Sequence, residues 1–361
     1  MARPTEITID LQALRHNLQR VRAYSPHSLV MAVVKANAYG HGLIQIASVL
    51  SASAADGLAV ASVEEGVALR EAGLQLPITV LSSIWERSDV EALLTWNLDP
   101  VLHNPQQLSL FAKCTNSRQL SPWLKIDTGM HRVGIAPDQI PSSIASLSVA
   151  SWVKELRLMT HFACADDIDN RATTRQLGCF MQVTKNTKLV RSAANSAAVI
   201  AWPASHLEWV RPGIMLYGCS PMLEGDGRVL GLQPVMTLRS RLTAVFDHQQ
   251  GESIGYGASW RCPQDTRIGL VPCGYADGYP RHAVSGTPVL VDGQRVGLAG
   301  RVSMDMLCVD LGSGSTARVG SEVVLWGTGL PVEEVAVASG TIGYELLCRL
   351  THRPSRHYLH G

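Results

Sequence analysis

The chain has 361 residues, of which 46% are hydrophobic and 17% charged, and its formal net charge at pH 7 is +1. This composition indicates a globular protein with enough apolar residues for a large core, and the length suggests two domains. The near-neutral charge provides no excess of positive charge to attract nucleic acid or an anionic membrane, so neither is an expected partner.

The first twenty residues, MARPTEITIDLQALRHNLQR, lack the apolar run of a secretory signal, and no stretch approaches the length of a membrane span. The eight cysteines, Cys114 among them, are scattered and contain no C-x-x-C pair. Scattered cysteines of this kind are typical of proteins in a reducing compartment, where most thiols are small core residues. We therefore expect a cytoplasmic protein, and no metal site.

Helical patterns separate short apolar runs through the first part of the chain. The first covers residues 10–24, with apolar side chains on one face. A second begins with the capping box SVEE (62–65) and stops at Gly73. A third has Asn104 as its N-cap and Pro105 at its first helical position.

Eight apolar runs have the length and composition of buried parallel strands. Eight β–α repeats in this length are what a (β/α)8 TIM-like barrel requires, although a doubly wound open sheet gives a similar alternation. The runs are LVMAVV (29–34), GLAV (57–60), PITVL (77–81), DPVL (99–102), WLKI (123–126), ELRLMT (155–160), KLVRSA (188–193) and LEWV (207–210).

The pattern changes after about residue 225. The segments 236–249, 267–272, 288–300, 306–311 and 322–327 have the character of antiparallel strands, with a tight turn at Asp292-Gly293, and one helical pattern follows at 344–351. We therefore expect an α/β barrel over residues 1–230 and a mostly antiparallel β domain over 231–361. The border is the Gly/Pro-rich segment 220–234.

Polar residues cluster where the predicted barrel strands end, which is where barrels of this kind carry their chemistry. Each residue alone has an ordinary explanation: loop lysines are usually solvated, single histidines pack, and arginines pair with carboxylates. Their shared position on one rim favours a functional site. They are Lys35 after the first strand, Lys125 and Arg132 after the fifth, His161 after the sixth, Asn195 and Ser196 after the seventh, and Arg211 after the eighth.

Two segments after the last two strands indicate a phosphate site. RSAANSA and RPGIMLYG supply a hydroxyl and a glycine whose N–H a phosphate can approach, although both segments also suit ordinary turns. A lysine and a phosphate site on one rim indicate a Schiff-base enzyme, either a class I aldolase or a pyridoxal phosphate enzyme. The aldolase alternative leaves the second domain unexplained.

Seven blocks, in order and over essentially the whole chain, resemble those of bacterial alanine racemases. AVVKANAYGHG (32–42) resembles the segment whose lysine carries pyridoxal 5'-phosphate in that family. The other blocks are LKIDTGMHRVG (124–134), THFACAD (160–166), VRPGIMLYG (210–218), IGYGASW (254–260), GYADGYPR (274–281) and GRVSMDM (300–306). The resemblance implies interconversion of L-alanine and D-alanine in a homodimer with shared active sites, either supplying D-alanine for peptidoglycan or degrading it.

The resemblance also implies a role for individual residues. Lys35 carries the cofactor and is one base, and Tyr256 of the partner subunit is the opposite base. The remaining implied roles are the following: Arg211 bonds the ring nitrogen; Arg132 bonds the ring phenolate oxygen and approaches the substrate carboxylate; Tyr39, Ser196, Gly213 and Ile214 hold the phosphate, beside Asn195; His161 orients Tyr256 through Arg211; Tyr275 and Met304 of the partner subunit line the substrate pocket; and Lys125 is the position that is carbamylated in many relatives.

Two positions depart from the family pattern. Ser192 stands where many members have a histidine, which alters a contact to the cofactor ring. His352 stands near the place of a phosphate-contacting tyrosine, which leaves the fourth phosphate contact open. Neither change affects the two bases.

Two bases on opposite faces suit inversion of a carbon centre, because a proton leaves one face and another arrives on the other. Free lysine and tyrosine titrate near ~10.4 and ~10, so the pKa of both groups must be lowered, and nearby cations can do this. A decarboxylase of the same architecture is the alternative enzyme. It is disfavoured because Tyr256 supplies a base on the second face. A non-catalytic cofactor-binding protein is disfavoured by the second domain, and a periplasmic racemase by the missing signal.

Overall fold

The computed structural model describes residues 3–82, 84–111 and 118–360. They form two compact units, each described here by itself. One unit consists of Asn17–Leu216 and Pro221–Glu224, and the other of Met1–His16, Tyr217–Ser220 and Gly225–Gly361. No helix within the described ranges combines the length and the apolar composition needed to cross a bilayer.

The first unit is a closed barrel of eight parallel strands, as the sequence predicts. Each predicted apolar run contains one barrel strand, and the open-sheet alternative is wrong because β9 pairs with β2. The strands are β2 (Leu29–Val33), β3 (Gly57–Val60), β4 (Ile78–Val80), β5 (Asp99–Leu102), β6 (Trp123–Lys125), β7 (Arg157–Met159), β8 (Val190–Asn195) and β9 (Trp209–Arg211).

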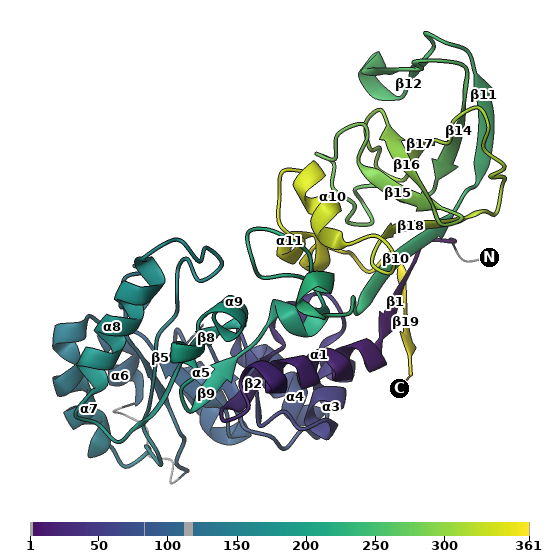
Figure 1. Cartoon of the computed structure of the whole chain (residues 1–361). Coiled ribbons are helices and arrows are strands. Elements are labelled where there is room, and N and C mark those ends of the chain that lie inside the picture. Colours follow the sequence, from purple (N-terminus) through teal and green to yellow (C-terminus); the bar gives the residue numbers. More distant parts are fainter. Residues whose placement is uncertain (1–2, 83, 112–117, 361) are drawn as a thin grey trace. The chain divides into compact units, whose positions relative to one another are not determined.

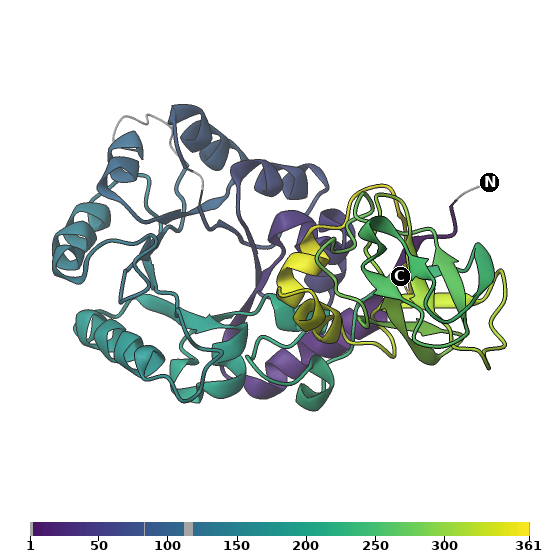
Figure 2. The ribbon, with the colours of Figure 1, turned by 90° about the horizontal axis from the view of Figure 1, so that it is seen from above.

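Helices surround the barrel on the outside (Figure 2). The predicted helix starts are confirmed: the Asn104 side chain accepts the N–H of Gln107 at 2.9 Å, and Ser62 accepts that of Glu65 at 3.4 Å. The helices of this part of the chain are α1 (Leu11–Tyr24), α2 (Lys35–Tyr39), α3 (Leu43–Ala52), α4 (Val63–Glu71), α5 (Arg87–Trp96), α6 (Pro105–Phe111), α7 (Ile140–Ser148), α8 (Ala172–Thr184) and α9 (Ser196–Ala201). Short 3-10 turns are η1 (Pro137–Gln139), η2 (Pro203–Ser205) and η3 (Ile214–Tyr217).

Aromatic side chains fill the barrel at the beginning of its strands. Trp123 and Trp209 are the first residues of β6 and β9, and their rings meet edge to face with centroids 6.3 Å apart. Because β6 and β9 are not neighbours in the barrel, this contact crosses its interior. The amino-terminal end is therefore packed with apolar groups, and polar side chains are left to the carboxyl-terminal rim.

The second unit is built on a nine-stranded sheet in the order β11-β14-β17-β16-β15-β18-β10-β1-β19. Its pairings are antiparallel except for β1 with β19, which lie side by side in Figure 1. The predicted Asp292-Gly293 turn joins β15 to β16, and both residues have positive φ. The strands are β1 (Glu6–Asp10), β10 (Met236–Arg241), β11 (Ala244–His248), β14 (Thr266–Val271), β15 (Pro288–Val291), β16 (Gln294–Ala299), β17 (Leu307–Asp310), β18 (Glu322–Trp326) and β19 (Ser355–Leu359).

Four features of this unit differ from the sequence expectation. Residues 236–249 form two strands, because the chain leaves β10 after Arg241 and turns before β11. β1 and β19 were not foreseen, and each pairs with a segment far away in the sequence. Two helices, α10 (Val332–Ala338) and α11 (Gly343–Cys348), stand where one was predicted, and a small hairpin joins β12 (Ser253–Ile254) to β13 (Trp260–Arg261).

Candidate functional site

The polar residues singled out in the sequence lie at the carboxyl ends of the barrel strands. Lys125 and Arg211 are the last residues of β6 and β9, and Asn195 is the last of β8. Lys35 and His161 come two residues after the ends of β2 and β7. Because the strands are parallel and closed into one barrel, these side chains share one rim.

Lys35 begins a turn of unusual backbone geometry. The next four residues, Ala36 to Tyr39, have φ between 52° and 55°, which is a left-handed helical turn. None of them is glycine, and L-residues disfavour this conformation. The turn places Tyr39 in a buried position, whereas Lys35 remains partly exposed.

Arg211 is a buried cation at the centre of the rim. Its guanidinium donates to Ser192 Oγ at 2.5 Å and to the carbonyl oxygens of Thr160 and Ala193 at 2.5 and 3.2 Å. Among the described residues, no carboxylate forms an ion pair with it, and burial lowers its pKa to about 10. The guanidinium therefore stays protonated at neutral pH. An anion or a hydrogen-bond acceptor placed against it would compensate its buried positive charge.

The cations of the rim act on one another. Burial and then Arg211, Arg132 and Lys35 lower the pKa of Lys125 to about 8. Burial and then Arg211 hold the pKa of His161 well below its ordinary value, so its imidazole is neutral at neutral pH. Arg211 Nη2 lies 3.5 Å from His161 Nδ1, which suits a neutral ring that accepts this hydrogen bond. The arrangement thus forms one electropositive rim.

The predicted phosphate residues also come together. Ser196 Oγ accepts the N–H of Gly213 at 2.8 Å, which joins the ends of β8 and β9. A Cβ on Gly213 would overlap the Tyr39 hydroxyl, so only glycine leaves this space open. Ile214 is fully buried at the start of η3, and Asn195 Oδ1 caps α9 by accepting the N–H of Ala198 at 3.0 Å. A hydroxyl, a phenol and a glycine therefore form a small polar cradle beside the cationic rim.

The other predicted residues lie in the second unit and are exposed there. Tyr256 is 66% exposed, Met304 53% and Tyr275 37%. The loops of the last two are joined, since Ala276 donates its N–H to the carbonyl oxygen of Met304 at 3.0 Å. The second unit therefore exposes all three of these large side chains.

A buried carboxylate that the sequence analysis did not single out supports these loops. Asp277 has a fully buried side chain, and Arg3 Nη1 lies 2.7 Å and Arg353 Nε 3.5 Å from its Oδ1. The two arginines come from opposite ends of the chain. The available signal was the position of Asp277 inside the block GYADGYPR, next to the predicted pocket residues.

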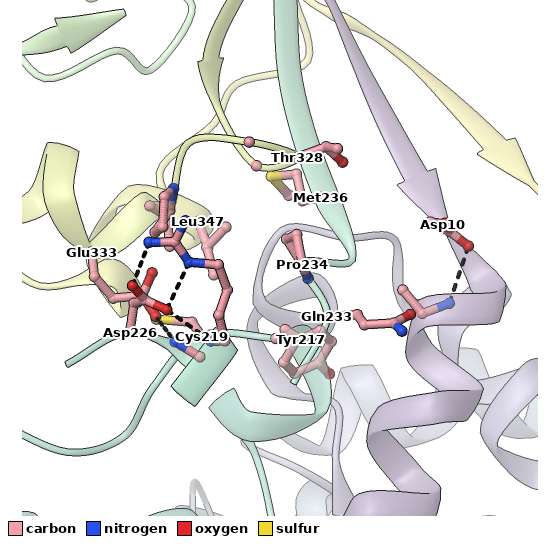
Figure 3. Close-up of a pocket in the computed structure, with 18 residues that line it drawn as sticks. Asp10, Tyr217, Cys219, Asp226, Gln233, Pro234, Met236, Thr328, Glu333 and Leu347 are labelled. Atoms are coloured by element: carbon pink, nitrogen blue, oxygen red, sulfur yellow. Dashed lines mark hydrogen bonds and ion pairs between the residues drawn. The ribbon is translucent and has the colours of Figure 1, made fainter. Parts of the chain in front are cut away.

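A cavity of about 280 Å³ lies elsewhere in the second unit (Figure 3). Its polar side chains are engaged in the fold: Asp10 accepts the N–H of Ala13, Asp226 pairs with Arg228 at 2.6 Å, and Glu333 accepts two backbone N–H groups. None of the predicted site residues lines it. The cavity is therefore separate from the candidate site at the barrel rim.

Comparison with known proteins gives one consistent result. Residues 9–221 match the family model described as "Alanine racemase, N-terminal domain", and residues 235–358 match "Alanine racemase, C-terminal domain". An alanine racemase of Vibrio cholerae is 50% identical over 97% of this chain and 97% of its own length. Among solved structures, a biosynthetic alanine racemase from Pseudomonas aeruginosa has a TM-score of 0.96 at 46% identity, covering 99% of this chain and 100% of the other. The alanine racemase from Acinetobacter baumannii has a TM-score of 0.93 at 36% identity, covering 99% of each chain.

Proposed function

Because the chain belongs to the alanine racemase family, we propose that it interconverts L-alanine and D-alanine with pyridoxal 5'-phosphate bound at the barrel rim. The observation that carries this proposal is the electropositive rim, where buried Arg211 has no carboxylate partner among the described residues. A phosphorylated, anionic cofactor supplies the negative charge that such a rim lacks, and its ring nitrogen is a further acceptor. The physiological role is either the supply of D-alanine for peptidoglycan or its degradation.

The residues present fit the cofactor. Lys35 is the proposed attachment point, and Tyr39, Ser196, Gly213 and Ile214, with Asn195 beside them, form the proposed cradle for its phosphate. Arg132 is the proposed partner of the ring phenolate oxygen and of the substrate carboxylate. A guanidinium donates hydrogen bonds but gives up no proton, so Arg211 would bond the ring nitrogen and leave it unprotonated.

When bound, the cofactor takes up the negative charge that removal of the α-proton leaves on the amino acid. Lys35 is the proposed base on one face of the substrate. Tyr256 of the partner subunit is the proposed base on the other face. His161, whose Nδ1 lies 3.5 Å from Arg211 Nη2, is proposed to orient this tyrosine through Arg211. A proton held at each face allows inversion in both directions.

Lys125 is proposed to be carbamylated. Its neutral amine would add to carbon dioxide, forming an N–C bond and releasing one proton, so that a cation becomes an anion. The cations that lower the pKa of Lys125, chiefly Arg211 and Arg132, would then attract this group instead of repelling it. The carbamate would hold Arg132 in place for the substrate carboxylate.

The proposed enzyme is a homodimer with shared active sites. Support comes from the exposure of Tyr256, Tyr275 and Met304, which lie in the unit that does not contain Lys35. Under two-fold symmetry, a contact that brings one copy's second unit to the other's barrel forms two identical sites.

The proposed location is the cytoplasm. In agreement, none of the seven cysteines in the described ranges is in a disulfide, whereas Cys114 lies outside them.

Two measurements test the reaction and its lysine. Purified protein supplied with pyridoxal 5'-phosphate should convert L-alanine into an equal mixture of the two enantiomers, measured by chiral chromatography. Borohydride reduction and peptide mapping should place the cofactor on Lys35. Release of carbon dioxide in place of D-alanine would identify a decarboxylase, and an adduct on Lys125 would contradict the assignment of the lysine.

Subunit exchange tests the shared site. Lys35→Ala and Tyr256→Ala proteins should each be nearly inactive alone. A mixed dimer would contain one site lacking both bases and one site with both, so activity should return to at most about half of the wild-type value. If both bases belonged to the same chain, every site would lack one base. No activity would then return, even with exchange confirmed by a labelled subunit.

A further inference from the structure

The left-handed turn after Lys35 needs support from outside itself. Four consecutive non-glycine residues hold φ between 52° and 55°, a conformation that the side chains of Ala36, Ala38 and Tyr39 do not favour. Asn37 supports the far side, where its Oδ1 accepts the N–H of Leu43 at 2.8 Å. The near side, directly after Lys35, is held by a different residue.

That residue is Glu65, in the first turn of α4. Its Oε1 accepts the N–H of Ala36 at 2.7 Å and the N–H of Asn37 at 3.3 Å. Its Oε2 accepts the N–H of Ala61, directly after β3, at 2.9 Å. One carboxylate therefore joins the first two left-handed residues to the neighbouring barrel strand.

Helix capping alone does not explain this side chain. In a capping box, the glutamate returns a bond to the backbone N–H of the cap residue, here Ser62. The Glu65 carboxylate instead accepts from Ala61 and from the turn. Only a carboxylate can accept on both of its oxygens, because the amide of glutamine has one oxygen and an NH2 group that donates.

We propose that Glu65 is a positioning residue for Lys35: it holds the left-handed turn and so fixes where the Lys35 side chain leaves the barrel rim. This inference rests on the proposed function, in which Lys35 carries the cofactor and acts as a base. Glu65 touches neither substrate nor cofactor in this scheme. It acts through the backbone of Ala36 and Asn37.

The test compares Glu65→Gln with Glu64→Gln in the holoenzyme. Glu64 is the adjacent residue in the same helical turn and is exposed, so its variant matches the loss of charge without touching the turn. Glu65→Gln should raise amide hydrogen exchange in the peptide 32–42. It should also lower kcat by tenfold to roughly a hundredfold, the cost of small misplacement of a catalytic group, with KM for alanine unchanged. Glu64→Gln should change neither exchange in this peptide nor kcat.

A second variant distinguishes positioning from general destabilisation. Glycine adopts positive φ without strain, so Ala36→Gly added to Glu65→Gln should restore part of kcat. Unchanged exchange and kcat in Glu65→Gln, or no recovery in the double variant, would overturn the proposal. Borohydride mapping in the same proteins reports separately on the proposed function. An adduct on a residue other than Lys35 would contradict the proposed function. The hydrogen-exchange result would still show whether Glu65 holds the turn.

Discussion

The lowered pKa of Lys125 gives a chemical prediction that can be measured directly. Carbon dioxide reacts only with a neutral amine, so the neutral fraction of Lys125 decides whether a carbamate forms. The perturbation is Lys125→Met, which keeps an unbranched side chain of similar length but removes the amine. Lys125→Glu is the matched variant, because it supplies a permanent carboxylate at the same position.

The structure sets the size of the effect. Burial and the neighbouring Arg211, Arg132 and Lys35 lower the pKa of Lys125 from 10.5 to about 8. At pH 7 this change raises the neutral fraction about 300-fold, to roughly a tenth of the molecules. Carbamate formation then removes a like charge from the rim and adds an opposite one, which favours the product further.

The assay is carbon NMR of the holoenzyme in isotope-labelled bicarbonate. The wild-type protein should show a carbamate carbonyl resonance that is absent from Lys125→Met. Because the carbamate holds Arg132, Lys125→Met should raise KM for alanine, and Lys125→Glu should raise it less. A fully active wild-type protein without this resonance would refute the reasoning. The same is true of a resonance that persists in Lys125→Met, since another lysine would then carry the group.

Two further predictions concern cofactor binding and stability. Gly213→Ala should weaken cofactor binding about 5- to 150-fold, because a Cβ there overlaps the Tyr39 hydroxyl and overpacking costs ~1–3 kcal/mol; Gly178→Ala in α8, where a Cβ meets open space, is the control in a cofactor titration. Burial raises the pKa of Asp99 to about 6, so the folded state binds this proton more tightly than the unfolded state. Wild-type stability should therefore fall relative to Asp99→Asn by about 2 kcal/mol as pH rises from 4 to 6, measured by urea unfolding. Parallel stability curves for the two proteins would show that Asp99 titrates normally.

The barrel was predictable because each of its strands is a short, uninterrupted apolar run between helical patterns. A strand such as GLAV (57–60) is buried on both faces, so its composition alone identifies it. β1 was missed although EITID alternates polar and apolar residues, because five residues are a weak signal and its partners lie more than 200 residues away. Sequence reading detects local periodicity, whereas this strand is stabilised by pairing with distant segments.

Within the candidate site, positions were more predictable than conformations. Strand ends placed Lys35, Lys125 and Arg211 on one rim, because parallel strands end together. The left-handed turn after Lys35 had only a weak local signal, since Asn37 tolerates positive φ but the alanines and the tyrosine around it do not favour it. Glu65 was visible only as part of a capping box, and its bonds to the turn depend on the barrel bringing the two segments together.

The pairing of β1 with β10 and β19 sets an order for folding during synthesis. β1 leaves the ribosome before both of its neighbours, which begin at Met236 and Ser355. At ~5–20 residues per second, synthesis of the residues between β1 and β10 takes roughly ten to fifty seconds. During that time all the strands of the barrel are made, while β1 keeps both edges open. A chain that stalls before Met236 therefore carries an unpaired strand at its N-terminus, the feature of an incomplete sheet that most readily pairs with another chain.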